Sequence, residues 1–187
     1  MTPLNDRASG AAAPAMPPTA HTHLAAHGRG LSWSRWWAAL TPPAWLAQLA
    51  LRLAIAVPFL KSGLLKWDGF LHLNDVAVAL FTDEFQLHLP GGPYPFPAPA
   101  VMAFLSACGE VVLPLLLIAG LGTRLAACAL MGMIVLIQLT VPDGWPVHAT
   151  WFAMAMAIAA GGPGALSLDH LIGRRLASLT RRRHEPR

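Results

Sequence analysis

The stretch Ala98–Leu121 constrains the fold more than any other, because it is almost wholly apolar over a length that can cross a lipid bilayer. Roughly 24 residues at about 1.5 Å per residue span the ~30 Å hydrocarbon layer. One acid, Glu110, lies near the middle. An ionisable group at that depth is costly, so we expect it to face protein and to have a partner. Pro114 follows four residues later and removes the backbone donor that would bond the carbonyl of Glu110.

Further apolar runs of spanning length recur along the chain. The chain is 55% hydrophobic and 12% charged, whereas a soluble chain of this size carries about 25% charged residues. The sequence therefore predicts an all-α fold, an integral membrane four-helix bundle surrounded by the lipid bilayer. The expected spans cover about 44–65, 98–121, 124–141 and 147–161.

The segments outside the spans divide the chain further. Residues 1–30 are rich in Ala, Pro, Thr and His, and we expect a disordered tail there. Residues 31–43 contain clustered tryptophans, which are typical of an interfacial anchor. The membrane domain is expected at 44–173, and 174–187 is a basic tail.

The distribution of Lys and Arg sets the expected orientation. Most of the 13 basic residues lie at the two ends or in the turn that contains Arg124, whereas the opposite side of the membrane holds Lys66. The positive-inside rule then predicts that both the N- and the C-terminus are cytoplasmic. Because the net charge of +4 is concentrated at the ends in this way, we expect no nucleic-acid partner.

The longest connection between spans is Trp67–Pro97. Within it, Asp75–Leu89 is expected to form a short helix at the outer interface, and Pro90–Pro99 an extended stop before the second span. After the last span, Ser167–Leu179 is expected to be an amphipathic helix on the cytoplasmic surface. Asp169 would favour the start of that helix through the helix dipole.

Three polar side chains inside the spans form the candidate intramembrane site: Arg52, Glu110 and Gln138. Arg52 lies within roughly 5 Å of Glu110 in depth if the first two spans centre alike, so it is the expected partner of the acid. The three residues could line a pocket that hydrogen-bonds a quinone headgroup. Alternatively, the arginine and the acid neutralise each other and only join two helices.

Other polar residues lie at the ends of the spans. His148, just inside the outer end of the fourth span, could relay protons near neutral pH, although an interfacial role is the preferred interpretation. Because His148 is the only histidine near a span, paired haem ligands are missing. The sequence contains no flavin or Fe–S motif and no CxxC, and no metal site is expected, so a quinone is the cofactor left open.

Three segments carry a resemblance to a known family. They are LRLAIAVPFLKSGLLKW (Leu51–Trp67), ACGEVVLPLLLIAGLGTRLAA (Ala107–Ala127) and GGPGALSLD (Gly161–Asp169). In order and spacing they resemble the DoxX family of four-helix bacterial inner-membrane proteins, over about Leu49–Ile172. The polar positions that match the family pattern are Arg52, Lys66, Glu110 and Arg124.

The resemblance implies a bundle in the bacterial inner membrane and a link to redox physiology. Some relatives are subunits of quinone-linked sulfur oxidoreductases, and others belong to thiol oxidative-stress complexes. The expected function is therefore an accessory subunit of a quinone- or thiol-linked membrane redox complex with oxidoreductase partner subunits. Whether the chain is itself an enzyme stays open, as does homo-oligomer formation. The alternatives are a non-enzymatic membrane scaffold or envelope-stress factor, and a small transporter.

Overall fold

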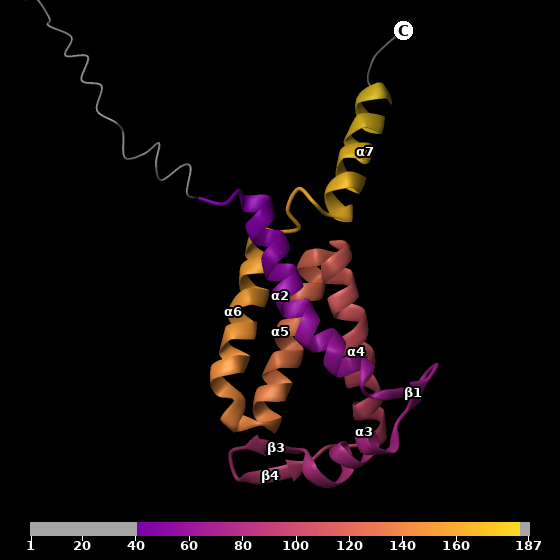
Figure 1. The fold of residues 1–187 in the computed structure, drawn as a ribbon, viewed down its shortest axis with the longest axis vertical. Coiled ribbons are helices and arrows are strands. Elements are labelled where there is room, and N and C mark those ends of the chain that lie inside the picture. Colours follow the sequence, from indigo (N-terminus) through magenta and orange to yellow (C-terminus); the bar gives the residue numbers. More distant parts are fainter. Residues whose placement is uncertain (1–40, 184–187) are drawn as a thin grey trace, which may run out of the picture. The chain divides into compact units, whose positions relative to one another are not determined.

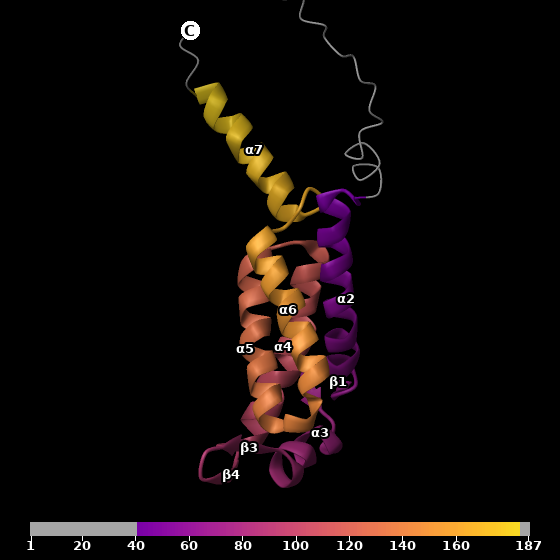
Figure 2. The same cartoon turned by 90° about the vertical axis from the view of Figure 1, so that its left-hand side faces the viewer.

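Four long helices lie side by side in residues 41–183, the part of the chain that the structure, a computed structural model, describes (Figure 1). They are α2 (Ala44–Leu64), α4 (Pro99–Ala119), α5 (Thr123–Thr140) and α6 (Trp145–Gly161). Each begins and ends within two residues of a predicted span. The turned view shows the same four helices packed along one another (Figure 2).

The helices fit a protein that crosses a membrane several times. By length and composition, α2, α4 and α5 can each span a bilayer. The α6 helix has 17 residues, at the short end of the range of about 17–25 that spans the hydrocarbon layer. The chain is therefore a multi-pass membrane protein, while the fourth span and the cytoplasmic position of both termini stay predictions. The expected N-terminal tail and most of the tryptophan-rich anchor lie outside the described residues.

A tight turn joins α4 to α5, as the sequence predicts. Gly120 ends α4 in the left-handed conformation, with a φ of 68°, and its backbone N–H points back to the carbonyls of Leu116 and Leu117. Gly122, with a φ of 56°, precedes the first residue of α5. Glycine adopts positive φ without a steric penalty, so two glycines allow the chain to reverse within three residues.

Apolar side chains from all four helices fill the centre of the bundle. The fully or nearly fully buried ones are Ile55, Phe59, Leu117, Leu130, Ile134 and Ile158. Close backbone contact between α2 and α4 depends on Gly63, because a Cβ added there would lie 2.8 Å from the Glu110 carbonyl carbon. Small residues allow helix backbones to approach in this way within membranes.

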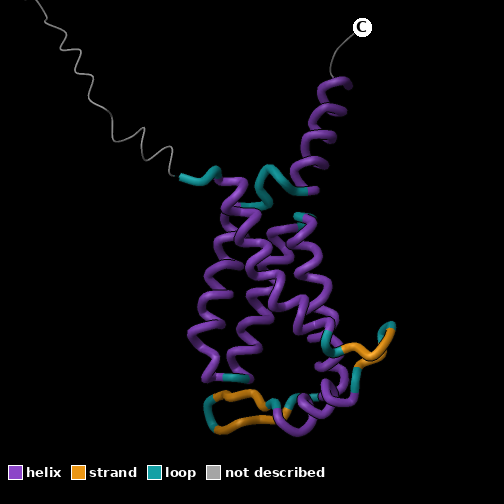
Figure 3. Tube along the Cα trace, viewed as in Figure 1, coloured by secondary structure: helices purple, strands orange, loops and turns teal. Residues whose placement is uncertain are grey.

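The connection between α2 and α4 gathers at one end of the bundle, which we call the loop end (Figure 3). It contains β1 (Trp67–Gly69) paired with β2 (His72–Leu73), the short helix α3 (Asp75–Ala79) and the π-helical turn η1 (Leu80–Glu84). Asn74 caps α3 by accepting a hydrogen bond from the Ala77 backbone nitrogen at 2.7 Å. Phe81 and Phe96 pack this segment against Ala103 of α4.

The helix predicted over Asp75–Leu89 is too long. The chain leaves the helical conformation after Glu84, and β3 (Gln86–Leu89) pairs antiparallel with β4 (Gly92–Pro95). The predicted extended stop therefore contains the second strand of a hairpin. The Pro90–Gly91 pair forms the turn, with Gly91 at a φ of 103°.

The opposite end of the bundle, which we call the α7 end, holds the Gly120–Gly122 turn and the start of α7 (Leu168–Arg183). The hydroxyl of Ser167 accepts a hydrogen bond from the His170 backbone nitrogen at 3.1 Å, so Ser167 caps α7. The observed helix begins one residue after the predicted start and runs four residues beyond the predicted end. Exposed apolar side chains occur on it at helical spacing: Leu168, Leu171 and Ile172.

Candidate functional site

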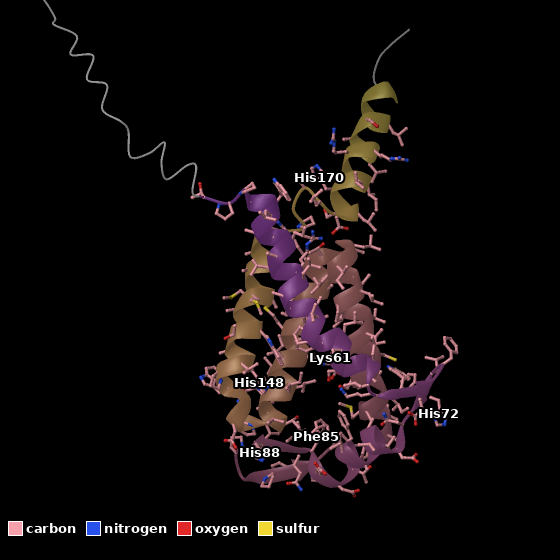
Figure 4. The ribbon with its side chains drawn as sticks, in the orientation of Figure 1. Lys61, His72, Phe85, His88, His148 and His170 are labelled. Carbon is pink, nitrogen blue, oxygen red and sulfur yellow. The ribbon has the colours of Figure 1, made fainter. Side chains whose placement is uncertain are left out.

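A cavity of about 580 Å³ lies among the helices toward the loop end. Its walls are mainly aromatic and aliphatic, and the largest lining side chains include Phe59, Phe81, Phe85, Phe96, Met133 and Trp151. His148 on α6 and Phe85 in the connection, both labelled in Figure 4, belong to the lining. An apolar cavity with a few polar groups is the usual form of a small-molecule site.

The first polar group of the cavity is centred on Glu110. Its carboxylate forms an ion pair and hydrogen bond with Lys66, which lies just beyond the end of α2. Ser106, one helical turn before the acid, donates to Oε1 at 3.1 Å. Lys66 also donates to the hydroxyl of Ser62 at 3.1 Å. The Lys66 and Glu110 side chains are 15% and 7% exposed, so the pair is largely shielded from solvent.

The predicted pairing of Arg52 with Glu110 is wrong. The prediction assumed that the midpoints of the first two spans lie at the same depth in the membrane. In the structure, Glu110 lies against Gly63, in the last turn of α2. Arg52 comes eleven residues before Gly63, which is roughly 16 Å along the helix. The stagger of α2 against α4 therefore brings Lys66, and not Arg52, to the acid.

Arg52 instead joins three elements at the α7 end. Its side chain is fully buried, with Nη1 3.4 Å from the carbonyl oxygen of Leu117 and Nη2 2.6 Å from that of Leu166. Its Nε has no hydrogen-bond partner among the described residues. The guanidinium thus bonds the last turn of α4 to the segment before α7. This geometry suits a planar, forked cation.

Asp169 completes this arrangement from α7. Its carboxylate accepts hydrogen bonds from the Gly122 backbone nitrogen at 2.8 Å, the Thr123 backbone nitrogen at 3.0 Å and the Thr123 hydroxyl at 3.0 Å. Burial alone would raise the pKa of Asp169, but these hydrogen bonds and the Arg52 charge hold that pKa below its usual value. We call Arg52, Gly122, Thr123 and Asp169 the α7-end cluster.

The second polar group of the cavity is the pair Gln138–His148. The Gln138 side-chain nitrogen donates to the Pro142 carbonyl at 3.0 Å, so its oxygen faces His148 Nδ1, 2.8 Å away. Nδ1 therefore donates to that oxygen, and Nε2 is the ring nitrogen left for a further partner. The ring is 7% exposed and lies beside Trp151, so it faces the interior of the bundle.

The predicted site residues thus separate into two places. Glu110 lines the cavity directly, Gln138 approaches it through His148, and Arg52 belongs to the α7-end cluster. Arg124 is exposed on the first turn of α5, with its guanidinium next to Gly162. Within residues 41–183, no three His, Cys, Asp or Glu side chains are grouped as metal ligands would be.

Sequence reasoning missed Lys66 as the partner of the acid, and it missed Ser106. A signal for both was available: Ser62 and Lys66, like Ser106 and Glu110, are four residues apart, the spacing that places side chains on one helical face. No local sequence pattern could predict the contact between Asp169 and Thr123, because 46 residues separate them.

Comparison with known proteins gives a family match. The DoxX family model matches residues 47–143, more than half of the chain, from α2 to the end of α5. The matched segment contains Arg52, Lys66, Glu110 and Arg124. No curated protein and no solved structure matches the chain. Together with the bundle of apolar helices, the match shows that this chain belongs to the DoxX family.

Proposed function

We propose that this DoxX protein holds a quinone headgroup in the 580 Å³ cavity, as an accessory subunit of a membrane redox complex. The observation that carries the proposal is the presence of two separate polar groups, Lys66–Glu110 and His148–Gln138, on one apolar cavity. A quinone has two carbonyl oxygens on opposite edges of a flat ring. It therefore needs hydrogen-bond donors at two places and apolar contact between them.

The aromatic lining supports the same ligand class. Phe59 and Trp151 meet edge to face, with ring centroids 4.9 Å apart, and both line the cavity. Flat rings pack favourably against such side chains. The sulfur-containing side chains of Met102 and Met133 add adaptable apolar contact.

The chemistry of the proposed site is reduction of the quinone to the quinol. Two electrons and two protons are taken up, and two O–H bonds form. The electrons come from a partner oxidoreductase of the thiol- or sulfur-oxidising class, in which two thiols become one disulfide and release two protons. Glu110 and His148 are the groups that would pass the protons. Lys66, whose ammonium has a third N–H beyond those bonded to Glu110 and Ser62, would donate to one quinone oxygen, and the doubly protonated His148 ring would donate from Nε2 to the other.

Quinone binding by the purified protein in lipid nanodiscs tests the proposal. Because Trp151 lines the cavity, a bound quinone should quench tryptophan fluorescence in a saturable manner. We expect Glu110→Gln and Lys66→Gln each to weaken binding about tenfold, which corresponds to about 1.4 kcal/mol. Asp143→Asn, an exposed change outside the cavity, is the matched control. Absence of saturable quenching in the unaltered protein would refute the proposal.

A purely structural role has one specific observation in its favour: the Lys66–Glu110 pair connects the end of α2 to the middle of α4. The double change Lys66→Gln with Glu110→Gln separates the two roles. If the pair only joins helices, each single change destabilises by leaving one buried charge unpaired, and the double variant regains both stability and function. If the pair binds quinone, the double variant folds and does not bind.

A further inference from the structure

The lining of the cavity is not equally buried on all sides. On α4 and α5 it includes residues that also form the outer surface: Leu105 is 58% exposed and Leu136 is 45% exposed. Ala129 and Gly132 of α5 line the cavity and are exposed as well. The cavity therefore reaches the surface along the seam between α4 and α5.

The shape of the α4–α5 hairpin explains the opening. The two helices are held together at the α7 end by the Gly120–Gly122 turn, and they separate toward the loop end (Figure 1). The connection closes the base of the gap with Phe81, Phe85 and Phe96, all of which line the cavity. The hydrogen bond between His88 and the Leu139 carbonyl, at 3.1 Å, fastens β3 to the end of α5. Aromatic side chains thus cover the water-facing end, while the side facing lipid is open.

Gly132 lies at the level of the acid. Leu121 is the central residue of the turn, and Gly132 and Glu110 are each eleven residues from it, so the two lie at the same height on antiparallel helices. A Cβ built at Gly132 meets no heavy atom within 4 Å. At Gly109 on the facing helix, an added Cβ would instead collide with Met133. The seam is therefore closed beside Gly109 and open beside Gly132.

We infer that the cavity is entered sideways from the bilayer, through the α4–α5 seam at Gly132. The inference rests on the proposed quinone site and specifies its substrate class: a membrane-dissolved molecule with a long apolar tail. The headgroup passes Gly132 and reaches Lys66 and Glu110, and the tail stays against Ala129, Leu105 and Leu136. The size of the side chain at position 132 then determines which molecules enter.

Chemical labelling tests the route without assuming any ligand. A cysteine replaces Ser106 in the cavity, in a chain that carries Cys108→Ala and Cys128→Ala. A long-chain alkyl maleimide dissolved in the bilayer should react faster than a charged, water-soluble maleimide. Gly132→Leu should slow the alkyl reagent at least tenfold. The matched control is Ala54→Leu, which enlarges an exposed residue of α2 that lines neither this cavity nor the 400 Å³ cavity between α5 and α6.

Equal labelling rates in the Gly132→Leu and Ala54→Leu chains would overturn the sideways route, and so would faster labelling by the water-soluble reagent. Binding of two quinones, one with a decyl tail and one without a tail, then tests the substrate class. We expect Gly132→Leu to weaken the tailed quinone at least tenfold and to change the tail-less one less than twofold. If the labelling result holds but neither quinone binds the unaltered protein, the route stands and the proposed quinone function fails.

Discussion

Asp169 accepts hydrogen bonds from both the backbone nitrogen and the hydroxyl of Thr123, each at 3.0 Å, so a residue of α7 caps the first turn of α5. The residue before that turn is Gly122, which has no side chain to serve as a cap, and its own nitrogen donates to Asp169 at 2.8 Å. The carboxylate also lies where the positive end of the α5 dipole stabilises a negative charge. α7 is thereby fixed to the hairpin that lines the cavity.

Removal of this cap should destabilise the bundle. We expect Asp169→Ala to lower the free energy of unfolding by about 1–3 kcal/mol, because donors at the start of α5 lose a charged acceptor. Thermal unfolding in detergent, followed by tryptophan fluorescence, measures the effect. Asp143→Asn, an exposed acid at the loop end, should leave the midpoint unchanged. Equal midpoints for Asp169→Ala and the unaltered protein would contradict the capping role.

The contribution of Asp169 should depend on pH in one direction. Its pKa is lower in the folded protein than the value of about 3.9 in an unfolded chain, so the charged form stabilises the fold. The stabilisation is complete above that unfolded-state pKa and is lost as the pH falls through the folded-state pKa. We expect the unaltered protein to unfold at a higher temperature than Asp169→Asn at pH 7, with the difference shrinking below about pH 4. A difference in unfolding temperature that increased as the pH fell would contradict a lowered pKa of Asp169.

Arg52 should be the least replaceable side chain of the α7-end cluster. Arg52→Leu leaves the Leu166 carbonyl without its side-chain donor, at a cost of about 1–3 kcal/mol, and removes one of the two donors of the Leu117 carbonyl, which keeps the Gly120 backbone N–H. Arg52→Lys keeps the charge but lacks the fork that reaches both carbonyls, so we expect an intermediate loss. Yield of monodisperse protein on size-exclusion chromatography ranks the variants. A lysine variant as stable as the unaltered protein would show that charge alone suffices.

Two glycines should respond in opposite ways to the same substitution. At Gly63, an alanine Cβ would lie 2.8 Å from the backbone and side chain of Glu110, so Gly63→Ala should push α2 from α4 and cost about 1–3 kcal/mol. At Gly132 the added methyl meets no atom within 4 Å, and Gly132→Ala should be neutral or stabilise α5 by up to about 1 kcal/mol. Thermal midpoints of the two variants, measured together, check the contrast. Similar losses at both positions would mean that α2 and α4 do not touch at Gly63.

The long helices could be predicted from the sequence because each is an apolar run, and a glycine or proline lies at, or within two residues beyond, every helix end except that of α2 at Leu64. These local features determine where a helix begins and ends. Glu110 was recognisable for the same reason, as an acid within such a run. The partner of Glu110 could not be recognised, because it depends on the offset between α2 and α4 along their axes. Nothing in the lengths of the runs encodes the stagger that aligns Glu110 with Gly63.

In the connection between α2 and α4, the prediction was wrong although the local sequence contained the information needed. Apolar residues between Asp75 and Leu89 resemble a helix, and the turn signal that ends it, Pro90–Gly91, was interpreted as part of an extended stop. The local residues were sufficient here, because a Pro–Gly pair between two short runs is typical of a hairpin. The contact between Asp169 and Thr123 could not be foreseen in this way, since it forms only when the bundle is complete.

The partners of Arg52 are synthesised at very different times. Synthesis proceeds from the N-terminus, so α2 leaves the ribosome long before Leu166 and Asp169 exist. Until then the arginine has the Leu117 carbonyl as its acceptor and no carboxylate nearby to balance its charge. A chain that stops before residue 166 would contain all four long helices, α2, α4, α5 and α6, with the Arg52 cation buried among them and without a carboxylate to balance it. The buried charge of Arg52 is therefore balanced only after the segment before α7 and the first turn of α7 have been made, so the last part of the chain to be synthesised completes the interior of the bundle.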